Sequence, residues 1–363
     1  MEIAKLYLQN FRNYKNEKIQ FSSGINVLQG QNGQGKTNIL EAIYYLLTGK
    51  SYRVRKEQEL IFWGENAFHI FGDFLAYERR LSLESHYLDK RKIVKINHVP
   101  CKKLSDFVGT INVVFFSPDD LIMVKGGPAE RRRFLDLHIT QLNSRHVHLL
   151  NDYNKVLHQK AALLKSSIQT SKVSNIEIWN EQLLDLGSKI IRNRWRFTQI
   201  IAKKSKEIYY QLSSGEEELS INYLALGHQD VEEALHEFPI LLEEKMKQEI
   251  ERQMILVGPH RDDLNFQLNG KSARIYASQG QQRSIVLSLK LAELEVIYQE
   301  KGEYPLLLLD DVLSELDIFR REYLLEFIQP IRQALITMTS AEKPSTEIAS
   351  LFQVDKGHIG RIN

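Results

Sequence analysis

The order of apolar and polar residues over the first 125 positions predicts strands alternating with helices. Glu2 to Leu8 alternate at period 2, which indicates a half-buried strand. Ile25 to Leu28 form a short apolar run that ends in glycine, and Thr37 to Leu47 repeat apolar residues at helical spacing. We expect an antiparallel meander beside this unit, because three further segments alternate: Phe68 to Leu75, Arg80 to Tyr87 and Ile93 to Ile96.

The middle of the chain has a helical pattern. Ala129 to Phe238 contain no proline and little glycine, which predicts a mainly helical arm at residues 126–250 with one strand at Leu219 to Tyr223. Beyond residue 255 strands and helices alternate again: a hairpin strand at Leu264 to Leu268 before Asn269-Gly270, a helix at Gln281 to Glu300, buried strands at Leu306 to Leu309 and Ala334 to Met338, and a closing hairpin at Phe352 to Ile362. The predicted fold class is α/β, with a head built from residues 1–125 and 251–363.

Composition excludes several classes of protein but does not indicate a binding partner. The 363 residues include 48 Lys and Arg against 46 Asp and Glu, so the net charge is only +2, and 43% of residues are hydrophobic. These values exclude disordered, collagen-like and disulfide-framework proteins. Cys101 is the only cysteine, so no intrachain disulfide can form, and no apolar run approaches the ~18 residues of a membrane span. We therefore expect a soluble cytoplasmic protein without a membrane partner.

A phosphate-binding loop follows the second predicted strand. Residues 30–37 fit the pattern G-x-x-x-x-G-K-[ST] at every fixed position and lie between a strand and a helix, as the mechanism requires. The bare pattern arises by chance in roughly one chain of this length in a hundred, and that context makes chance rarer still. Lys36 would neutralise phosphate charge and Thr37 would ligate Mg²⁺. The predicted nucleotide-binding residues are Gly30, Gln31, Asn32, Gly33, Gln34, Gly35, Lys36, Thr37 and Asn38.

Two aspartates complete this candidate site. The apolar strand Leu306 to Leu309 ends in Asp310 and Asp311, and an acid at the carboxyl edge of a parallel sheet lies where a nucleotide-bound Mg²⁺ would sit. Alone this is a weak signal, because buried strands often end in acids at a turn. With the loop, we predict that Asp310 is a metal ligand beside Thr37. Asp311 would orient the attacking water or accept its proton.

A second anion-binding pattern precedes the long helix. Ser278 to Gln282 place Ser and Gly-Gln at a helix N-terminus, and Ser314 to Asp317 follow soon after Asp311. In this order the motifs resemble those of the ATP-binding cassette head family, an ABC-type P-loop ATPase head with a mixed sheet and an antiparallel strand subdomain. The resemblance implies that Ser278, Gly280 and Gln281 cap the γ-phosphate of ATP bound by a second copy. It places Ser278 among the catalytic residues, with Lys36, Asp310 and Asp311.

The resemblance narrows further to the RecF family of bacterial recombination mediators, related to the chromosome-maintenance ATPases. It rests on three segments: the start of the chain from Glu2 to Tyr14, the residue sequence of the phosphate loop from Gly30 to Asn38, and the run from Pro118 to Asp136. It implies an ATP-dependent homodimer that binds double-stranded and gapped DNA, acts at single-strand gaps in replication and repair, and works with RecR and RecO to load recombinase during SOS induction.

Two departures from transporter-type cassettes bear on the rate of hydrolysis. Asp311 stands where those cassettes usually have glutamate, and Thr339-Ser340 stand where many of them have a histidine that senses the γ-phosphate. A shorter carboxylate holds the attacking water less well. We therefore expect a weak, DNA-dependent ATPase that acts as a switch.

Basic residues gather in patches despite the near-zero net charge. The longest runs from Lys189 to Lys206 without an acidic residue and could neutralise several DNA phosphates, although a solvated helix face would look the same. The other patches are Lys50 to Lys56, Lys90 to Lys92 with Lys95, Lys102-Lys103, and Arg131 to Arg133.

Other polar residues leave alternatives open. Arg131 to Arg133 could contact phosphate or pair with acids of the helical arm, and Arg12 could approach the nucleotide or serve the structure. His260 to Asp263 fit no zinc spacing and are better explained as a polar turn.

Two other functions share part of these motifs. A cassette ATPase powering a membrane transporter shares the motifs but not the length, the helical insert or the N-terminal strand motif. A small-molecule P-loop kinase leaves Ser278 to Gln282 and Ser314 to Asp317 without a role.

Overall fold

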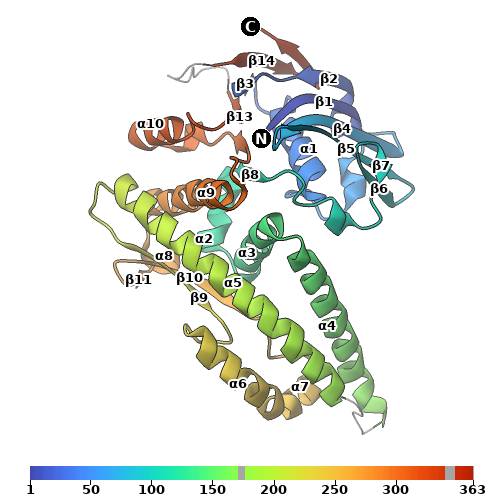
Figure 1. The fold of residues 1–363 in the computed structure, drawn as a ribbon, viewed down its shortest axis with the longest axis vertical. Coiled ribbons are helices and arrows are strands. Elements are labelled where there is room, and N and C mark those ends of the chain that lie inside the picture. Colours follow the sequence, from blue (N-terminus) through green and yellow to red (C-terminus); the bar gives the residue numbers. More distant parts are fainter. Residues whose placement is uncertain (171–175, 340–347, 363) are drawn as a thin grey trace. The chain divides into compact units, whose positions relative to one another are not determined.

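The computed structural model describes residues 1–170, 176–339 and 348–362, with side chains left out for 166–170. They form two compact units, Met1–Asp120 with Lys290–Asn363 and Leu121–Leu289 (Figure 1). The second unit is larger than the arm expected at residues 126–250. Residues 251–289, which the sequence pattern assigned to the head, join it because their first strand pairs with a strand of the arm.

The first unit contains two six-stranded sheets. Its elements in chain order are β1 (Glu2–Phe11), β2 (Tyr14–Gln20), β3 (Gly24–Gln29), α1 (Lys36–Thr48), η1 (Glu57–Leu60), β4 (Ala67–Ala76), β5 (Arg79–Leu88), β6 (Arg91–Ile96), β7 (Val99–Pro100), η2 (Leu104–Asp106), β8 (Val113–Phe116), η3 (Pro118–Leu121), β12 (Leu306–Asp310), η4 (Leu313–Glu315), α10 (Ile318–Phe327), β13 (Gln333–Met338), β14 (Ser350–Asp355) and β15 (His358–Arg361).

One sheet has the strand order β15-β14-β3-β13-β12-β8. All neighbours in it are parallel except β14 and β15, which form the predicted closing hairpin. Every residue of β12 and β13 is buried, as expected for central parallel strands covered on both faces. β3 lies between β13 and β14, so a strand from the start of the chain is held by two strands from its end (Figure 1).

The other sheet has the order β2-β1-β4-β5-β6-β7 and is antiparallel throughout, which confirms the predicted meander. α1 contacts strands of both sheets, so most of its residues are buried. The approach to β4 is close: a Cβ on Gly72 would lie 2.9 Å from Cδ2 of Leu46. Phe68 packs against Tyr45 of α1, and the next residue, His69, lies on the opposite face of the sheet.

The second unit is mainly helical. Its elements are α2 (Ile122–Lys125), α3 (Pro128–Leu142), α4 (Arg145–Thr170), α5 (Ile176–Leu212), β9 (Leu219–Leu224), α6 (Val231–Glu244), α7 (Met246–Arg252), β10 (Asp263–Leu268), β11 (Lys271–Ser272), α8 (Ala273–Tyr276) and α9 (Gln279–Lys301), whose last turns belong to the first unit.

Two long helices form the core of the second unit. α4 and α5 pack along each other, and apolar residues from both fill the space between them, among them Tyr153, Leu164, Leu183 and Ile190. α5 also packs on β9, which pairs with β10 in a small antiparallel sheet. The predicted hairpin at Asn269-Gly270 is confirmed, with positive φ at both residues. Within the described ranges no helix has the length and hydropathy needed to cross a bilayer.

Candidate nucleotide-binding site

The predicted phosphate loop connects β3 to α1 in the first unit. Its tip, Gln31 to Gly33, is exposed, whereas Gly35 is buried with a φ of 116°. A Cβ on Gly35 would lie 2.5 Å from Nδ2 of Asn13, and one on Gly30 would lie 2.3 Å from the carbonyl oxygen of Val354. Only glycine fits either position, because no larger residue avoids these neighbours.

Two turns brace the loop from outside. Asn13 donates from Nδ2 to the carbonyl oxygen of Gln34 at 2.9 Å and accepts at Oδ1 from Nδ2 of Asn38 at 2.8 Å. In the β14–β15 turn, the N–H of Gly357 donates to the same Gln34 carbonyl at 3.2 Å, and the N–H of Lys356 donates to Oε1 of Gln34 at 2.7 Å. The loop is therefore fixed in shape before any phosphate binds.

Lys36 lies inside the loop. Its Nζ donates to the carbonyl oxygens of Gly30 at 2.7 Å and Gln31 at 2.9 Å, so the ammonium group is held on the concave side of the backbone. Burial lowers the pKa of Lys36, while the charges of Asp311 and Asp310 oppose that shift. The Lys36 ammonium group therefore lies near Asp310 and Asp311, the two acids that the sequence predicted for this site.

Thr37 and Asp310 meet, although they are far apart in the sequence. The Thr37 hydroxyl donates to Oδ1 of Asp310 at 2.8 Å, and Oγ1 of Thr337 donates to the same oxygen at 2.8 Å. Burial raises the pKa of Asp310, and the hydrogen bonds from Thr337 and Thr37 partly offset that shift. A hydroxyl and a buried carboxylate in contact are the hard oxygen donors that Mg²⁺ prefers, so these residues fit the ion.

Thr337 is a site residue that the sequence interpretation missed. Its hydroxyl also accepts the N–H of Asp311 at 2.8 Å, and Asp311 itself has a φ of 53°. Thr337 thus fixes both aspartates at the end of β12. A signal was present, because Thr337 carries the one hydroxyl of the apolar strand Ala334 to Met338, and a buried hydroxyl needs a partner. Ser340, two residues past the end of β13, lies outside the described residues.

Glu41 anchors a second network beside the loop. It is fully buried in α1 and accepts a two-bond pair from Nε and Nη2 of Arg12, each at 2.8 Å. The Ser51 hydroxyl donates to it at 2.6 Å. Arg53 donates from Nη1 to Oδ1 of Asn38 at 2.9 Å. These contacts favour the structural alternative for Arg12 and place Arg53, one residue of the Lys50 to Lys56 patch, next to the loop.

The signature-like segment belongs to the second unit, so its geometry is described separately from that of the loop. Ser278 and Gln281 cap α9 reciprocally: the N–H of Ser278 donates to Oε1 of Gln281 at 2.6 Å, and the N–H of Gln281 donates to Oγ of Ser278 at 3.2 Å. Ser278 and Gly280 are exposed. Just before them, Ile275 and Tyr276 are 71% and 70% exposed, an unusual position for two large apolar side chains.

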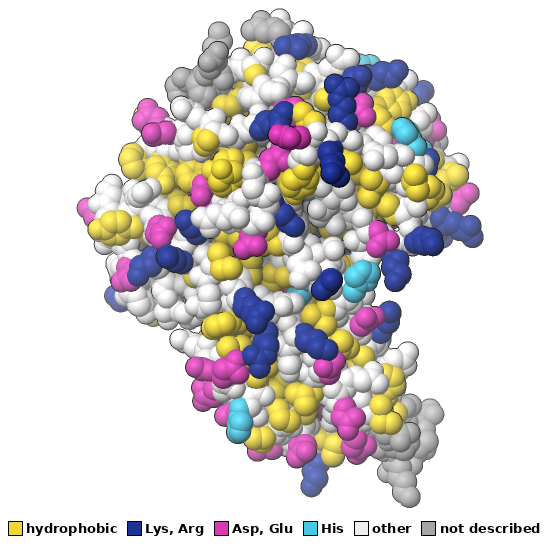
Figure 2. All heavy atoms as spheres, in the orientation of Figure 1, with side chains coloured by type: hydrophobic (Ala, Val, Ile, Leu, Met, Phe, Trp, Pro, Cys, Tyr) yellow, Lys and Arg dark blue, Asp and Glu magenta, His cyan; other side chains and the backbone are white. Residues whose placement is uncertain are grey.

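The longest basic patch, Lys189 to Lys206, is not a row of unpaired cations. Arg194 is 4% exposed and forms two 2.8 Å bonds with Asp136, while Nη1 donates to the carbonyl oxygen of Pro259 at 2.6 Å. Arg192 pairs with Glu232 at 2.8 Å and Lys189 with Asp185 at 2.7 Å. On the face drawn in Figure 2, basic and acidic side chains are interspersed. The patch therefore offers fewer charges to DNA than its sequence indicates.

Two arginines of the Arg131 to Arg133 run bond to aspartates of their own unit. Arg131 is buried and bonds to both oxygens of Asp263, at 2.6 Å and 2.9 Å. Nη1 of Arg132 donates to the carbonyl oxygen of Asp262 at 2.7 Å. Asp262 is buried, bonded by the Tyr223 hydroxyl and by the N–H of Leu226 at 2.9 Å. The segment from His260 to Asp263 is thus a polar turn in an ion-pair network.

His260 makes the stability of the second unit depend on pH. Burial lowers the pKa of His260 to about 4, from an ordinary value of 6.5. Between these values the unfolded chain binds more protons than the folded one, so stability is present above pH 6.5 and is lost as pH falls. We expect a loss of about 2 kcal/mol between pH 7 and pH 5 from this residue. Urea denaturation at both pH values measures it.

Two variants test this assignment. His260→Gln should remove about 2 kcal/mol of the pH dependence, whereas His158→Gln, at an exposed position of α4, should keep that of the wild type. Equal dependence in all three proteins would show that His260 is not the responsible group.

Comparisons with known proteins show the family of this chain. The sequence profile of a family described as an AAA domain matches residues 5–318. The DNA replication and repair protein RecF of Desulfitobacterium hafniense (strain DSM 10664 / DCB-2) is 65% identical over 364 residues, covering 100% of both chains. The protein of the same name from Geobacillus sp. (strain WCH70) is 42% identical, covering 99% of this chain and 98% of its own.

Solved structures give the same result. The structure of the recombination mediator protein RecF-ATPrS in the RecFOR pathway has a TM-score of 0.92 and 33% identity, covering 100% of this chain and 98% of its own. A SmcHead bound to the C-winged helix domain of ScpA has a TM-score of 0.58 at 17% identity over 100% of this chain and 97% of its own, which shows a shared fold alone. The predicted ATPase-head fold is confirmed. The chain belongs to the RecF family of DNA replication and repair proteins.

Proposed function

We propose that this chain is an ATP-dependent DNA-binding protein that acts as a switch in replication and recombinational repair at single-strand gaps. The observation that carries the proposal is the 2.8 Å contact between Thr37 and Asp310, which joins the phosphate loop to the acidic end of β12. Support comes from the solved structure of RecF-ATP in the RecFOR pathway, 33% identical with a TM-score of 0.92.

The loop residues Gly30 to Asn38 would bind ATP. Their backbone and the start of α1 favour negative charge, and Lys36 would neutralise phosphate oxygens. Thr37 and Asp310 would hold Mg²⁺, which when bound supplies further charge neutralisation at the β- and γ-phosphates. Asp311, fixed through Thr337, would orient the attacking water or accept its proton. The shorter side chain of Asp311 supports slow, switch-like turnover; steady-state turnover at the rate of a transporter ATPase would contradict it.

The second half of each site would come from another copy of the chain. Ser278, Gly280 and Gln281 are exposed or half-buried at the start of α9, where N–H groups can meet a γ-phosphate. Large apolar residues are exposed beside two of the motifs on which the cassette resemblance rests: Ile275 and Tyr276 before Ser278, and Ile318 and Phe319 after Asp317. Burial of such surface would favour association when ATP is bound.

DNA contact would use basic side chains that remain at the surface. Exposed pairs of this kind are Arg55-Lys56, Lys90-Arg91 and Lys102-Lys103, all in the first unit. Binding through them should weaken steeply with salt. RecO and RecR are the proposed protein partners, as the RecFOR pathway of the related structures suggests.

Sedimentation velocity and DNA binding, each with and without ATP, test the proposal. We expect ATP to convert the wild-type monomer to a dimer and to strengthen DNA binding. Lys36→Arg and Ser278→Arg should both abolish dimerisation, but only Lys36→Arg should impair ATP binding by the monomer.

Ser144→Arg, at an exposed serine before α4, controls for the added charge and should dimerise normally. A wild-type protein that stays monomeric with saturating ATP and DNA, or that binds DNA without salt dependence, would contradict the proposal.

A further inference from the structure

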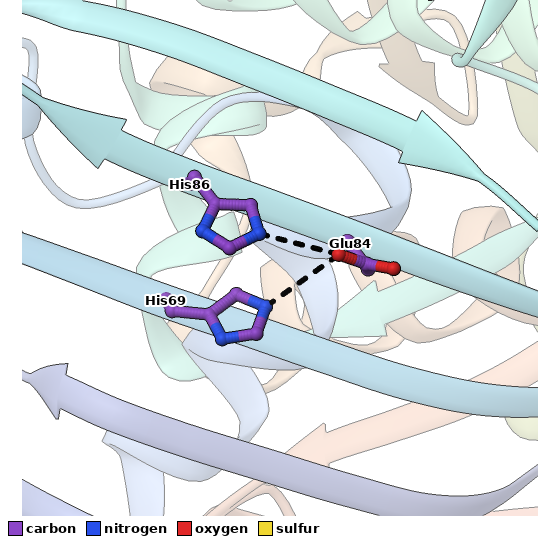
Figure 3. A group of neighbouring side chains, drawn as sticks. All are labelled: His69, Glu84 and His86. Atoms are coloured by element: carbon purple, nitrogen blue, oxygen red, sulfur yellow. Dashed lines mark hydrogen bonds and ion pairs between the residues drawn. The ribbon is translucent and has the colours of Figure 1, made fainter. Parts of the chain in front are cut away.

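Two histidines and a glutamate meet on the face of the β2-β1-β4-β5-β6-β7 sheet that is opposite α1. His69 in β4 pairs directly across from His86 in β5, and Glu84 precedes His86 by two residues and so shares its face. Figure 3 shows both imidazole rings directing a nitrogen at the same carboxylate. None of these residues takes part in the nucleotide site.

The spacing of these atoms is close to that of metal ligands. Nε2 of His86 lies 3.2 Å and Nε2 of His69 lies 3.9 Å from Oε2 of Glu84. All three atoms lie within 4.8 Å of one another. The rings stack 3.8 Å apart at 9°, and both direct a nitrogen toward Glu84 (Figure 3). Ligand atoms around a tetrahedral Zn²⁺ are about 3.3 Å apart, a geometry that small rotamer changes would reach here.

One nitrogen of His69 has no hydrogen-bond partner among the described residues. Its Nε2 is buried and forms no hydrogen bond among the described residues, and 3.9 Å is too long for one to Glu84. A buried imidazole nitrogen without a hydrogen-bond partner is a candidate metal ligand.

Other residues contact the Glu84 carboxylate, and a cavity opens beside the two histidines. Nδ1 of His98 contacts Oε1 of Glu84 at 2.5 Å, which leaves Oε2 toward the two rings. Lys95 lies 3.3 Å from Oε2, and it is the charge that an ion would have to displace. A cavity of about 840 Å³ opens beside the pair, lined by His69, His86, Ile93 and Lys95 among others. Water or a ligand could reach a fourth coordination position from it.

We propose that His69, Glu84 and His86 bind one divalent transition-metal ion, with Zn²⁺ the best match. Two imidazole nitrogens and one carboxylate oxygen are ligands typical of zinc and unsuited to Mg²⁺ or Ca²⁺. The ion would link β4 to β5 through their side chains. A second group, His228 with Glu233 and Glu237, offers only one histidine and two partly or fully exposed acids, and serves as the comparison.

Competition between the protein and a chromophoric chelator for Zn²⁺ tests the site. Untagged full-length protein, freed of metal and kept in excess Mg²⁺, should bind one Zn²⁺ per chain, and Co²⁺ should give the visible absorption of a tetrahedral site. His69→Gln and His86→Gln should each weaken Zn²⁺ binding at least about tenfold. Lys95→Met removes the competing charge and should tighten it.

The matched control is His228→Gln, which should bind Zn²⁺ like the wild type. Thermal unfolding without metal checks that each variant is folded. Absence of stoichiometric Zn²⁺ binding, unchanged affinity in both His69→Gln and His86→Gln, weaker binding in Lys95→Met, or loss of binding in His228→Gln would each overturn the proposal.

Discussion

Replacing Asp310 by asparagine is expected to lower ATP turnover by about a hundredfold or more and, in the same protein, to raise the unfolding temperature without nucleotide. Turnover falls because the carboxylate that would hold Mg²⁺ with Thr37 is lost. Stability rises because burial raises the pKa of Asp310, which means that its charged form costs free energy in the folded protein at neutral pH. Asparagine keeps an oxygen that can accept from Thr37 and Thr337.

A steady-state ATPase assay and thermal unfolding measure these opposite effects. Asp185→Asn removes the same charge from an exposed, paired position on α5 and should change neither quantity. Wild-type turnover in Asp310→Asn would exclude Asp310 as the metal ligand. A lower unfolding temperature would show that its charge does not destabilise the fold.

Replacing Arg194 by methionine should lower the unfolding free energy of the second unit by about 3–5 kcal/mol, because Asp136 then keeps a buried charge without its partner. Although burial opposes them, Arg194 and His146 lower the pKa of Asp136, so the carboxylate stays charged. Arg192→Met breaks an exposed pair two residues away and should cost at most about 1 kcal/mol.

Urea denaturation followed by tryptophan fluorescence separates the two variants. Two of the three tryptophans, Trp179 and Trp195, lie in α5, so the signal reports mainly on the second unit. Adding Asp136→Leu to Arg194→Met should restore part of the lost stability. Equal effects of Arg194→Met and Arg192→Met would contradict the importance of the buried pair.

Features encoded by short-range patterns could be predicted from the sequence. The loop around Lys36 was identifiable because phosphate binding demands fixed residues at fixed spacing next to a helix start. The meander strands and the Asn269-Gly270 hairpin followed from period-2 alternation and turn chemistry, and the structure confirms them.

Features that depend on distant residues could not be predicted. Arg131 and Asp263 are 132 positions apart, and Arg194 and Asp136 are 58 apart, so neither pair leaves a local signal. The pairing of β9 with β10, which moves residues 251–289 into the second unit, depends on a register that no single strand carries. The basic run Lys189 to Lys206 therefore indicated a DNA-binding surface, whereas in the fold several of its cations pair with acidic residues.

The position of β3 between β13 and β14 has a consequence for synthesis of the protein. As the chain leaves the ribosome, the first 120 residues emerge while two strands that flank β3 are still untranslated. The second unit can fold first, because it is formed by one continuous stretch of the sequence, Leu121–Leu289. The turn at Lys356 and Gly357, which donates two hydrogen bonds to Gln34 of the nucleotide loop, is made last, so we expect an incomplete nascent chain to hold this loop less firmly than the finished protein.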